Sequence, residues 1–164
     1  MNTGYKANLK IFYDIIEKRL QYSWQASDNI DLKANYLLGF EGIILSVIFS
    51  SYSRIIINIH IIYIIGVILI FLSFFLTICT AKCIGFYINP KPKNLIKKYI
   101  KSKEIVIYEV VLSSMLKAYE KNNKIISGKA KCFNYSIFTL FVGILFIITS
   151  VLLNLEGGCL QIKW

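Results

Sequence analysis

Three segments of the chain are long and apolar enough to cross a lipid bilayer. They run over about residues 37–53, 59–79 and 135–155, and none of them contains a proline. A helix rises about 1.5 Å per residue, so a hydrocarbon core of about 30 Å takes about 20 residues. The first segment is short, but Leu32, Ala34 and Tyr36 extend it. Because lipid cannot satisfy backbone polar groups, the sequence predicts an all-α membrane protein with three transmembrane helices.

The polar stretches between these segments divide the chain into five parts. We expect an amphipathic cytoplasmic helix over residues 1–35 and a transmembrane hairpin over 36–80. These are followed by a basic cytoplasmic helical module over 81–132, a third transmembrane helix over 133–156 and an external tail over 157–164. In both cytoplasmic parts the apolar residues have helical spacing, so we expect the spanning helices to continue into a small cytoplasmic bundle. The spaced residues are Leu9, Phe12, Ile16, Leu20, Trp24, Ile105, Tyr108, Leu112, Met115 and Tyr119.

Nearly all of the net charge of +10 lies in one central stretch. Residues 82–131 contain twelve lysines and three glutamates, whereas the turn over 51–58 contains a single cation, Arg54. Lysine-rich loops stay on the cytoplasmic side of a membrane. The amino terminus and the large loop are therefore expected in the cytoplasm of a bacterial inner membrane, without a nucleic-acid partner. The charge adjoins the apolar segments and faces membrane lipid, which favours a membrane-flanking loop over a nucleic-acid surface.

The sequence offers little catalytic chemistry. Its single histidine, His60, lies at the outer end of the second apolar segment, and neither a nucleophile motif nor a metal-binding carboxylate cluster is present. Cys79, Cys83 and Cys132 lie near the reducing side and lack the short spacing of zinc sites. We therefore expect neither catalytic residues nor a metal or cofactor, and interpret these cysteines as small packing residues.

Polar and small residues inside the first apolar segment are the candidates for an oligomer or pore face. A charge such as Glu41 is costly in lipid and usually faces protein or water, although near the cytoplasmic end it can also reach the interface. Gly42, Ser46 and Ser50 recur every four residues, which is the spacing that lets helices approach closely. These four residues indicate a homo-oligomer, unless the small ones only pack against the second span of the same chain.

Two short motifs resemble those of the membrane effectors of Pycsar anti-phage systems (PycTM-like). The first is Asp31-Leu32-Lys33-Ala34 leading into the first span, similar to an Asp-x-Lys-Ala signature. The second is Asn123-Lys124-Ile125 followed by Lys129 before the last span, similar to an Asn-x-x-Ile-x-x-x-Lys pattern. The two motifs bracket most of the chain.

The resemblance implies an effector that a partner cyclase activates through a cyclic pyrimidine nucleotide, cUMP or cCMP. Activation would impair the inner membrane and abort phage production. Candidate nucleotide-binding residues are Trp24, Asp31, Lys33, Asn123 and Lys129. A membrane immunity protein of the bacteriocin type, acting by partner binding, is the alternative, and a holin-like toxin without a ligand is a third hypothesis.

Overall fold

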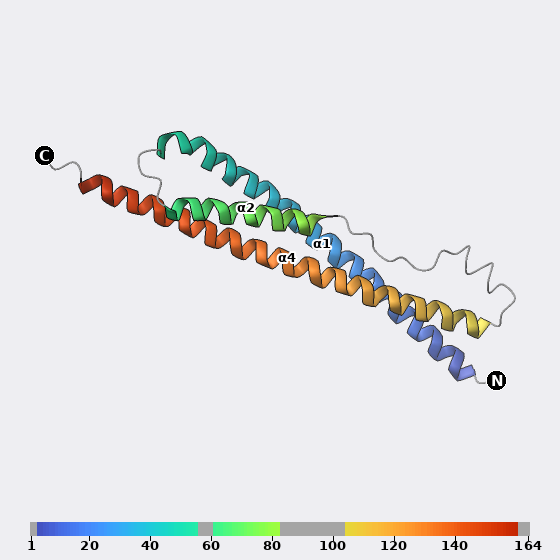
Figure 1. Cartoon of the computed structure of the whole chain (residues 1–164). Helices are drawn as coiled ribbons and strands as arrows, with labels where there is room; N and C mark the ends of the chain where they lie inside the picture. Colours follow the sequence, from blue (N-terminus) through green and yellow to red (C-terminus); the bar gives the residue numbers. More distant parts are fainter. Residues whose placement is uncertain (1–2, 56–60, 83–103, 161–164) are drawn as a thin grey trace. The chain divides into compact units, whose positions relative to one another are not determined.

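The computed structural model describes residues 3–55, 61–82 and 104–160, and their regular structure is entirely α-helical. The helices are α1 (Thr3–Ile55), α2 (Ile61–Ala81) and α4 (Glu104–Leu160), as Figure 1 shows. Each is long and apolar enough to cross a membrane. The expected fold class, an all-α membrane protein with three candidate spans, is thereby confirmed, and the chain is a multi-pass membrane protein.

Two of the helices are far longer than a single membrane crossing. α1 has 53 residues and α4 has 57, whereas the 21 residues of α2 rise by about 31 Å, close to the thickness of the hydrocarbon core. α1 and α4 run without a break through their polar and apolar parts. α4 also extends to Leu160, into the stretch expected to be a tail.

The contacts divide the chain into two compact units. We call residues 1–29 with 83–128 the lysine-rich unit, and residues 30–82 with 129–164 the membrane unit. α1 and α4 each contribute to both units. The divisions at 29/30 and 128/129 fall inside these helices, a few residues before the expected limits at 35/36 and 132/133.

The lysine-rich unit is held together by an apolar contact between α1 and α4. Its core consists of Ile16 and Leu20 from α1 with Met115 and Ala118 from α4. Two aromatic rings extend this contact, since Tyr13 meets Tyr108 edge to face with ring centroids 6.2 Å apart. Near the start of α1, the Tyr5 hydroxyl donates a 2.7 Å hydrogen bond to Glu109.

The prediction of an apolar stripe on the first helix is correct in part. Leu9, Ile16 and Leu20 are buried, whereas Phe12 is exposed and Trp24 is 38% exposed. Ser23 and Ser27 are buried instead. The buried face therefore continues along small polar side chains, which a count of apolar residues does not register.

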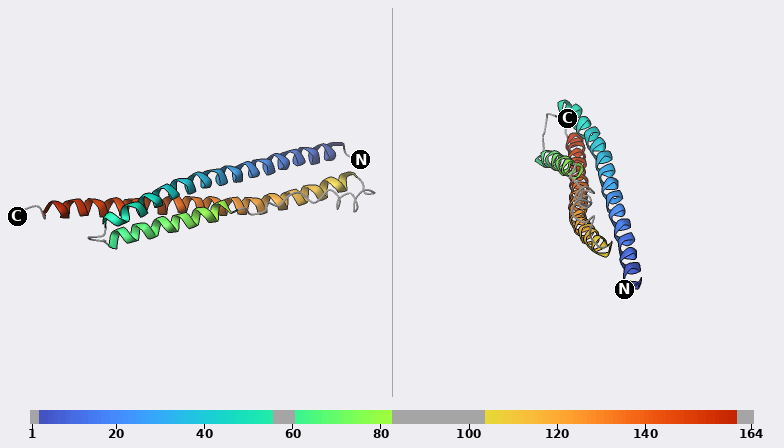
Figure 2. Two further views of the ribbon diagram at one scale, coloured as in Figure 1. Left: turned by 90° about the horizontal axis from the view of Figure 1, so that it is seen from above. Right: turned by 90° about the vertical axis from the view of Figure 1, so that its right-hand side faces the viewer.

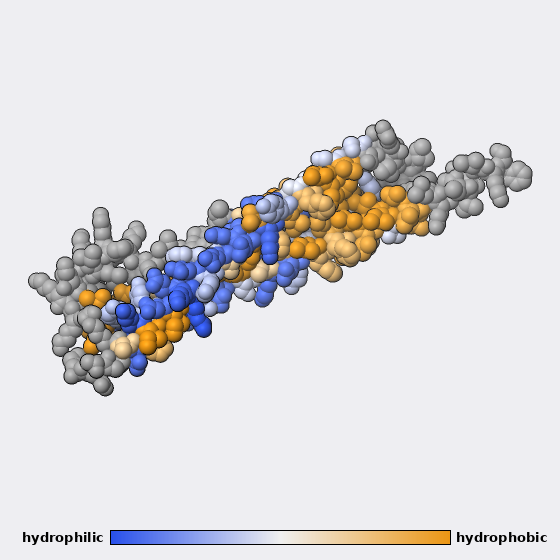
Figure 3. All heavy atoms as spheres, turned by 180° about the vertical axis from the view of Figure 1, so that it is seen from behind, coloured by the Kyte–Doolittle hydropathy of each residue, from blue (hydrophilic) through white to orange (hydrophobic). Residues whose placement is uncertain are grey.

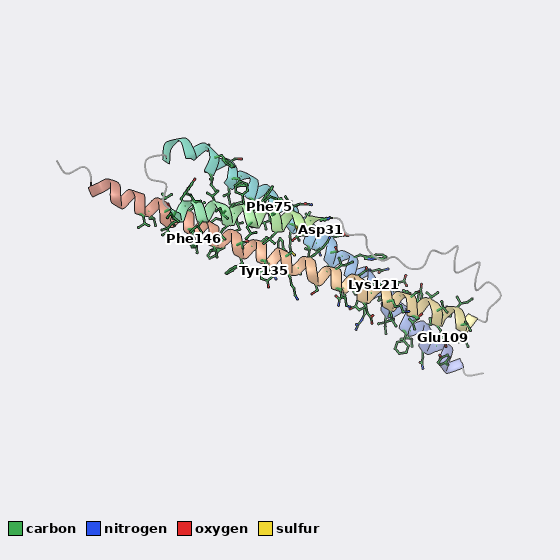
Figure 4. The ribbon with its side chains drawn as sticks, viewed as in Figure 1. Asp31, Phe75, Glu109, Lys121, Tyr135 and Phe146 are labelled. Carbon is green, nitrogen blue, oxygen red and sulfur yellow. The ribbon has the colours of Figure 1, made fainter. Side chains whose placement is uncertain are left out.

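The membrane unit contains the whole of α2 and parts of α1 and α4, with α2 antiparallel to the other two helices (Figure 2). Its core consists of Ile48, Tyr63, Ile70 and Leu140. Orange, apolar side chains cover most of the part of this unit that Figure 3 shows. Many large apolar side chains are exposed there, among them Phe75, which Figure 4 labels on α2. In a membrane these side chains meet lipid.

Two glycines set the closest approach of α2 to α4. A Cβ atom placed on Gly66 would lie 2.8 Å from Ile147 Cγ1 and 2.9 Å from the Gly143 carbonyl oxygen. A Cβ atom on Gly143 would lie 2.9 Å from Ile70 Cγ1 and 3.0 Å from the Gly66 carbonyl oxygen. Since real Cβ atoms essentially never come this close, only glycine fits at both positions. Small residues of this kind let membrane helices pack backbone to backbone.

Candidate functional site: polar residues inside the membrane unit

Polar side chains occupy the buried face of the membrane unit at regular intervals. On α4 the buried positions Lys129, Ser136, Gly143 and Ser150 are seven residues apart. On α2 the buried residues follow steps of three and four, which is the same period; they are Tyr63, Gly66, Ile70, Ser73, Thr77 and Thr80. A seven-residue repeat keeps one face of a helix towards its neighbours. This face is where small and polar residues are concentrated.

Glu41 lies at the centre of this polar face. Its side chain is fully buried in the membrane unit. Oε1 lies within hydrogen-bond distance of the hydroxyl oxygens of Ser73 and Thr77, and the Thr77 contact measures 3.2 Å. Oε2 has no hydrogen-bond partner among the described residues. The glutamate is therefore directed into the three-helix bundle, where two hydroxyl groups of α2 surround one of its oxygens.

Ser73 connects this glutamate to the third helix. Its hydroxyl oxygen lies 2.7 Å from the backbone carbonyl oxygen of Ser136 on α4. The carbonyl is within reach because Ser73 and Ser136 are both small and both fully buried. Glu41, Ser73 and Ser136 thus form a continuous polar contact from α1 through α2 to α4.

An ion pair between α1 and α4 forms a second polar contact in the membrane unit. Lys129 Nζ donates hydrogen bonds of 2.7 Å to both carboxylate oxygens of Asp31, which Figure 4 labels on α1. The Lys129 side chain is 3% exposed and that of Asp31 30%. The lysine is therefore almost completely removed from water, and the aspartate supplies the opposite charge that makes this burial tolerable.

The candidate nucleotide-binding residues are distributed over both units. Asp31 and Lys129 meet in the membrane unit, where Lys33 is exposed on α1. Trp24 and Asn123 belong to the lysine-rich unit, and both are exposed. Within the membrane unit, the structure brings Lys129 and Asp31 together.

The buried asparagine of the second motif is Asn122. The spacing Asn-x-x-Ile-x-x-x-Lys, counted back from Ile125 and Lys129, ends on Asn122, which is fully buried, whereas its neighbour Asn123 is exposed. The motif therefore places its asparagine and its lysine on the buried side of α4, seven residues apart.

The small residues of the first span are not covered by the other residues that the structure describes. Ser46 and Ser50 are exposed, and each donates its hydroxyl proton to a backbone carbonyl of its own helix. Gly42 is half-buried, and a Cβ atom there would meet nothing within 4 Å. Glu41 does not share this face, because it is buried against α2. The Gly42/Ser46/Ser50 face is open, and in the membrane it meets lipid or another chain.

Sequence reasoning missed the partners of Glu41 and the glycines that bring α2 and α4 together. Ser73, Thr77 and Ser136 lie within strongly apolar segments, where single hydroxyl residues attract little attention. A signal was present nonetheless. Small or polar residues recur every seven positions on α4 from 129 to 150, and a helix repeats its contact face with that period.

Among the cysteines, Cys79 is exposed and Cys132 is half-buried, while Cys83 and His60 lie outside the described residues. Within the described ranges, no group of three His, Cys, Asp or Glu residues is arranged to hold a metal ion. Comparisons with protein-family models, curated proteins and solved structures give no match for this chain.

Proposed function

We propose that this protein is a membrane effector of anti-phage defence, activated by a cyclic pyrimidine nucleotide, cUMP or cCMP, from a partner cyclase. On activation it impairs the bacterial inner membrane. The observation that carries this proposal is the Asp31–Lys129 ion pair. It joins the two motifs that resemble the Pycsar effectors, although they are 98 residues apart in the chain.

The ion pair suggests how an anionic ligand acts. A phosphate competes with the Asp31 carboxylate for the Lys129 ammonium, because both are anions that accept charge-assisted hydrogen bonds. Asp31 is the more exposed partner, so the pair is reached from its side. Exposed lysines of the lysine-rich unit attract the ligand over longer distances. Ligand binding then favours an arrangement of α1 and α4 in which this pair is broken.

The orientation follows from the lysine distribution, with the amino terminus in the cytoplasm. Thiol labelling of intact cells with a membrane-impermeant reagent tests it. Cys159 is expected to react, whereas Cys79, Cys83 and Cys132 are expected to remain unlabelled until the membrane is permeabilised. Labelling of Cys132 in intact cells would reverse the orientation.

Dye-filled vesicles of phosphatidylethanolamine and phosphatidylglycerol, containing the purified full-length protein, test the function. We expect cUMP or cCMP to release the dye, and cyclic AMP and linear UMP to leave the vesicles intact. Calorimetric titration of the protein in detergent measures binding separately from damage. Neither binding nor release with either cyclic pyrimidine nucleotide would reject the proposal.

One observation favours the alternative of a membrane immunity protein. The membrane unit has an apolar groove of about 370 Å³ formed by α1, α4 and Ile70 of α2, and lined by Phe40, Val47, Ile144, Ile148 and four further apolar residues. Such a groove fits an apolar helix of a partner. In this case the protein protects cells against a bacteriocin, its overproduction is harmless, and cyclic nucleotides have no effect on vesicles that contain it.

A further inference from the structure

The two carboxyl oxygens of Glu41 have different surroundings. Oε1 is hydrogen-bonded to two hydroxyls, whereas Oε2 has no partner among the described residues, although the side chain is fully buried. An ionised carboxylate shares its charge between both oxygens, and burial of a charge without partners is very costly. The surroundings of Oε2 therefore fit the oxygen of a neutral carboxylic acid better than that of a carboxylate.

The count of hydroxyl protons leads to the same conclusion. Ser73 has one hydroxyl proton, but its oxygen makes hydrogen-bond contacts with both Glu41 Oε1 and the Ser136 carbonyl oxygen. A carbonyl group and an ionised carboxylate both only accept, so with Glu41 ionised one of these contacts has no proton. With a proton on Oε1, Glu41 donates to Ser73 and Ser73 donates to Ser136. Both contacts are then hydrogen bonds.

The Thr77 hydroxyl does not supply the proton that is missing when Glu41 is ionised. Its oxygen lies 3.2 Å from Glu41 Oε1 and 3.0 Å from the carbonyl oxygen of Ser73 on its own helix. Both are acceptors for the single hydroxyl proton of Thr77. Whichever acceptor receives the Thr77 proton, the Ser73 hydroxyl oxygen still contacts two acceptors and has one proton.

Among the described residues, no cation forms an ion pair with Glu41. On α4 the nearest lysine of the buried row is Lys129, seven residues before Ser136 and so about 10 Å away along the helix axis. Lys129 is already paired with Asp31, which precedes Glu41 by ten residues on α1. On α2 the helix itself carries no charged residue; the nearest, Lys82, follows its end and is exposed. The other titratable groups at this end of the spans are exposed, apart from the half-buried thiol of Cys132; they are Lys33 and Tyr36 on α1, Cys79 on α2, and Lys131, Cys132 and Tyr135 on α4.

We propose that Glu41 is a proton-binding site within the membrane, and that its proton holds α1, α2 and α4 together. The hydrogen-bond chain runs from Glu41 through the Ser73 hydroxyl to the backbone of α4 at Ser136. When the proton is released to water, the carboxylate has to be hydrated, which requires α2 to separate from its neighbours. This inference concerns the membrane unit alone and does not rest on the proposed nucleotide response.

Infrared difference spectroscopy of the full-length protein in lipid nanodiscs tests the protonation directly. The carbonyl stretch of a neutral carboxylic acid is separate from the bands of carboxylates and amides. At neutral pH an ordinary glutamate, with a pKa of about 4.3, is ionised. We expect a neutral carboxyl band in the wild type and in the control Glu120→Gln, an exposed position, and its loss in Glu41→Gln. Absence of this band from the wild type at neutral pH would overturn the proposal.

Two further measurements keep the test valid if Glu41→Gln does not fold. Ser73→Ala removes the acceptor of the Glu41 proton, so the band is expected to persist and to shift to higher frequency. In the wild type the thermal stability is expected to fall as the pH rises and the proton is lost. Folded Glu41→Gln is expected to lack this fall, because its amide stays neutral. A stability that instead follows Na⁺ concentration at constant pH would assign the site to a metal cation and reject the proton.

Discussion

Asp31 and Lys129 are 98 residues apart in the chain, yet both carboxylate oxygens of Asp31 lie 2.7 Å from the Lys129 ammonium nitrogen. The two residues differ in exposure, since the lysine is buried and the aspartate is partly open to solvent. Loss of Asp31 and loss of Lys129 therefore have different effects on stability. An isolated buried ammonium is costly, whereas a partly exposed carboxylate can be hydrated.

The first prediction concerns the stability of this pair. We expect Asp31→Asn to destabilise the protein by about 1–3 kcal/mol, the range for hydrogen bonds to charged groups. Lys129→Met is expected to cost less, because it removes the buried charge. The double variant is expected to be more stable than the sum of the single effects indicates. Chemical unfolding in detergent, followed by circular dichroism, measures the stability of all three variants. Additive effects would show that Asp31 and Lys129 are not energetically coupled.

The second prediction separates ligand binding from folding. Lys33 is exposed on α1, so Lys33→Ala is expected to leave unfolding unchanged. If Lys33 contacts the ligand phosphate, the substitution weakens cyclic nucleotide binding by about 1–3 kcal/mol. Lys129→Ala is expected to weaken both binding and stability. Lys18→Ala removes another exposed lysine of α1 and is the matched control in calorimetric titrations. Equal losses for Lys18→Ala and Lys33→Ala would indicate only general electrostatic attraction.

The third prediction concerns the close approach of α2 and α4. Gly66→Ala and Gly143→Ala each place a methyl group within 3.0 Å of atoms of the facing helix, including a backbone carbonyl oxygen. We expect a loss of about 1–3 kcal/mol, as for overpacked cores. Gly39→Ala and Gly42→Ala are controls, because nothing lies within 4 Å of the added methyl group. These two are expected to gain about 0.5–1 kcal/mol from reduced backbone entropy in the unfolded chain.

The fourth prediction concerns the open face of α1. Ser46→Leu and Gly42→Leu leave the described contacts between helices intact, because Ser46 is exposed and Gly42 has free space beside it. If this face joins copies of the chain, both variants are expected to shift the mass of the particle in light scattering and to prevent vesicle leakage. Nucleotide binding is expected to remain. Cys79→Leu, at an exposed position of α2, is the control. A wild-type monomer with and without ligand, whose leucine variants still cause leakage, would reject the homo-oligomer.

The fifth prediction concerns the lysine-rich unit. The hydrogen bond to Glu109, and then its negative charge, raise the pKa of Tyr5 above 10.0. Glu109→Gln is expected to lower the pKa of Tyr5 towards that value. In the wild type the hydrogen bond is present while the phenol is protonated and is lost as the pH rises through the raised pKa, so this contact weakens only under alkaline conditions. NMR titration of labelled tyrosine measures the shift, with Tyr5→Phe to assign the signal. An unchanged titration in Glu109→Gln would show that the contact does not form in solution.

Much of the fold could be predicted from the sequence for direct physical reasons. Long apolar segments without proline have to be helical in lipid, because only a helix satisfies its own backbone there. The helical spacing of apolar residues such as Ile16 and Leu20 predicted that the helices continue into the polar parts of the chain. Both residues are buried in the structure. Glu41 was recognised from the sequence because a carboxyl group in an apolar segment is costly.

The choice of contact face was decided only by the tertiary structure. Lipid and protein interior are both apolar, so hydrophobicity does not tell which side of a spanning helix meets a neighbour. The sequence equally allowed Gly42, Ser46 and Ser50 to pack within the chain, yet Gly66 and Gly143 make the close approach.

The partners of the polar groups also required the folded chain. The sequence alone determined that Glu41, Asp31 and Lys129 lie in or beside apolar segments, where polar groups need partners. It did not determine the partners, because Ser73 is 32 residues from Glu41 and Lys129 is 98 residues from Asp31. These pairs form only when α1, α2 and α4 pack in one register, since hydrogen bonds and ion pairs act over a few ångströms.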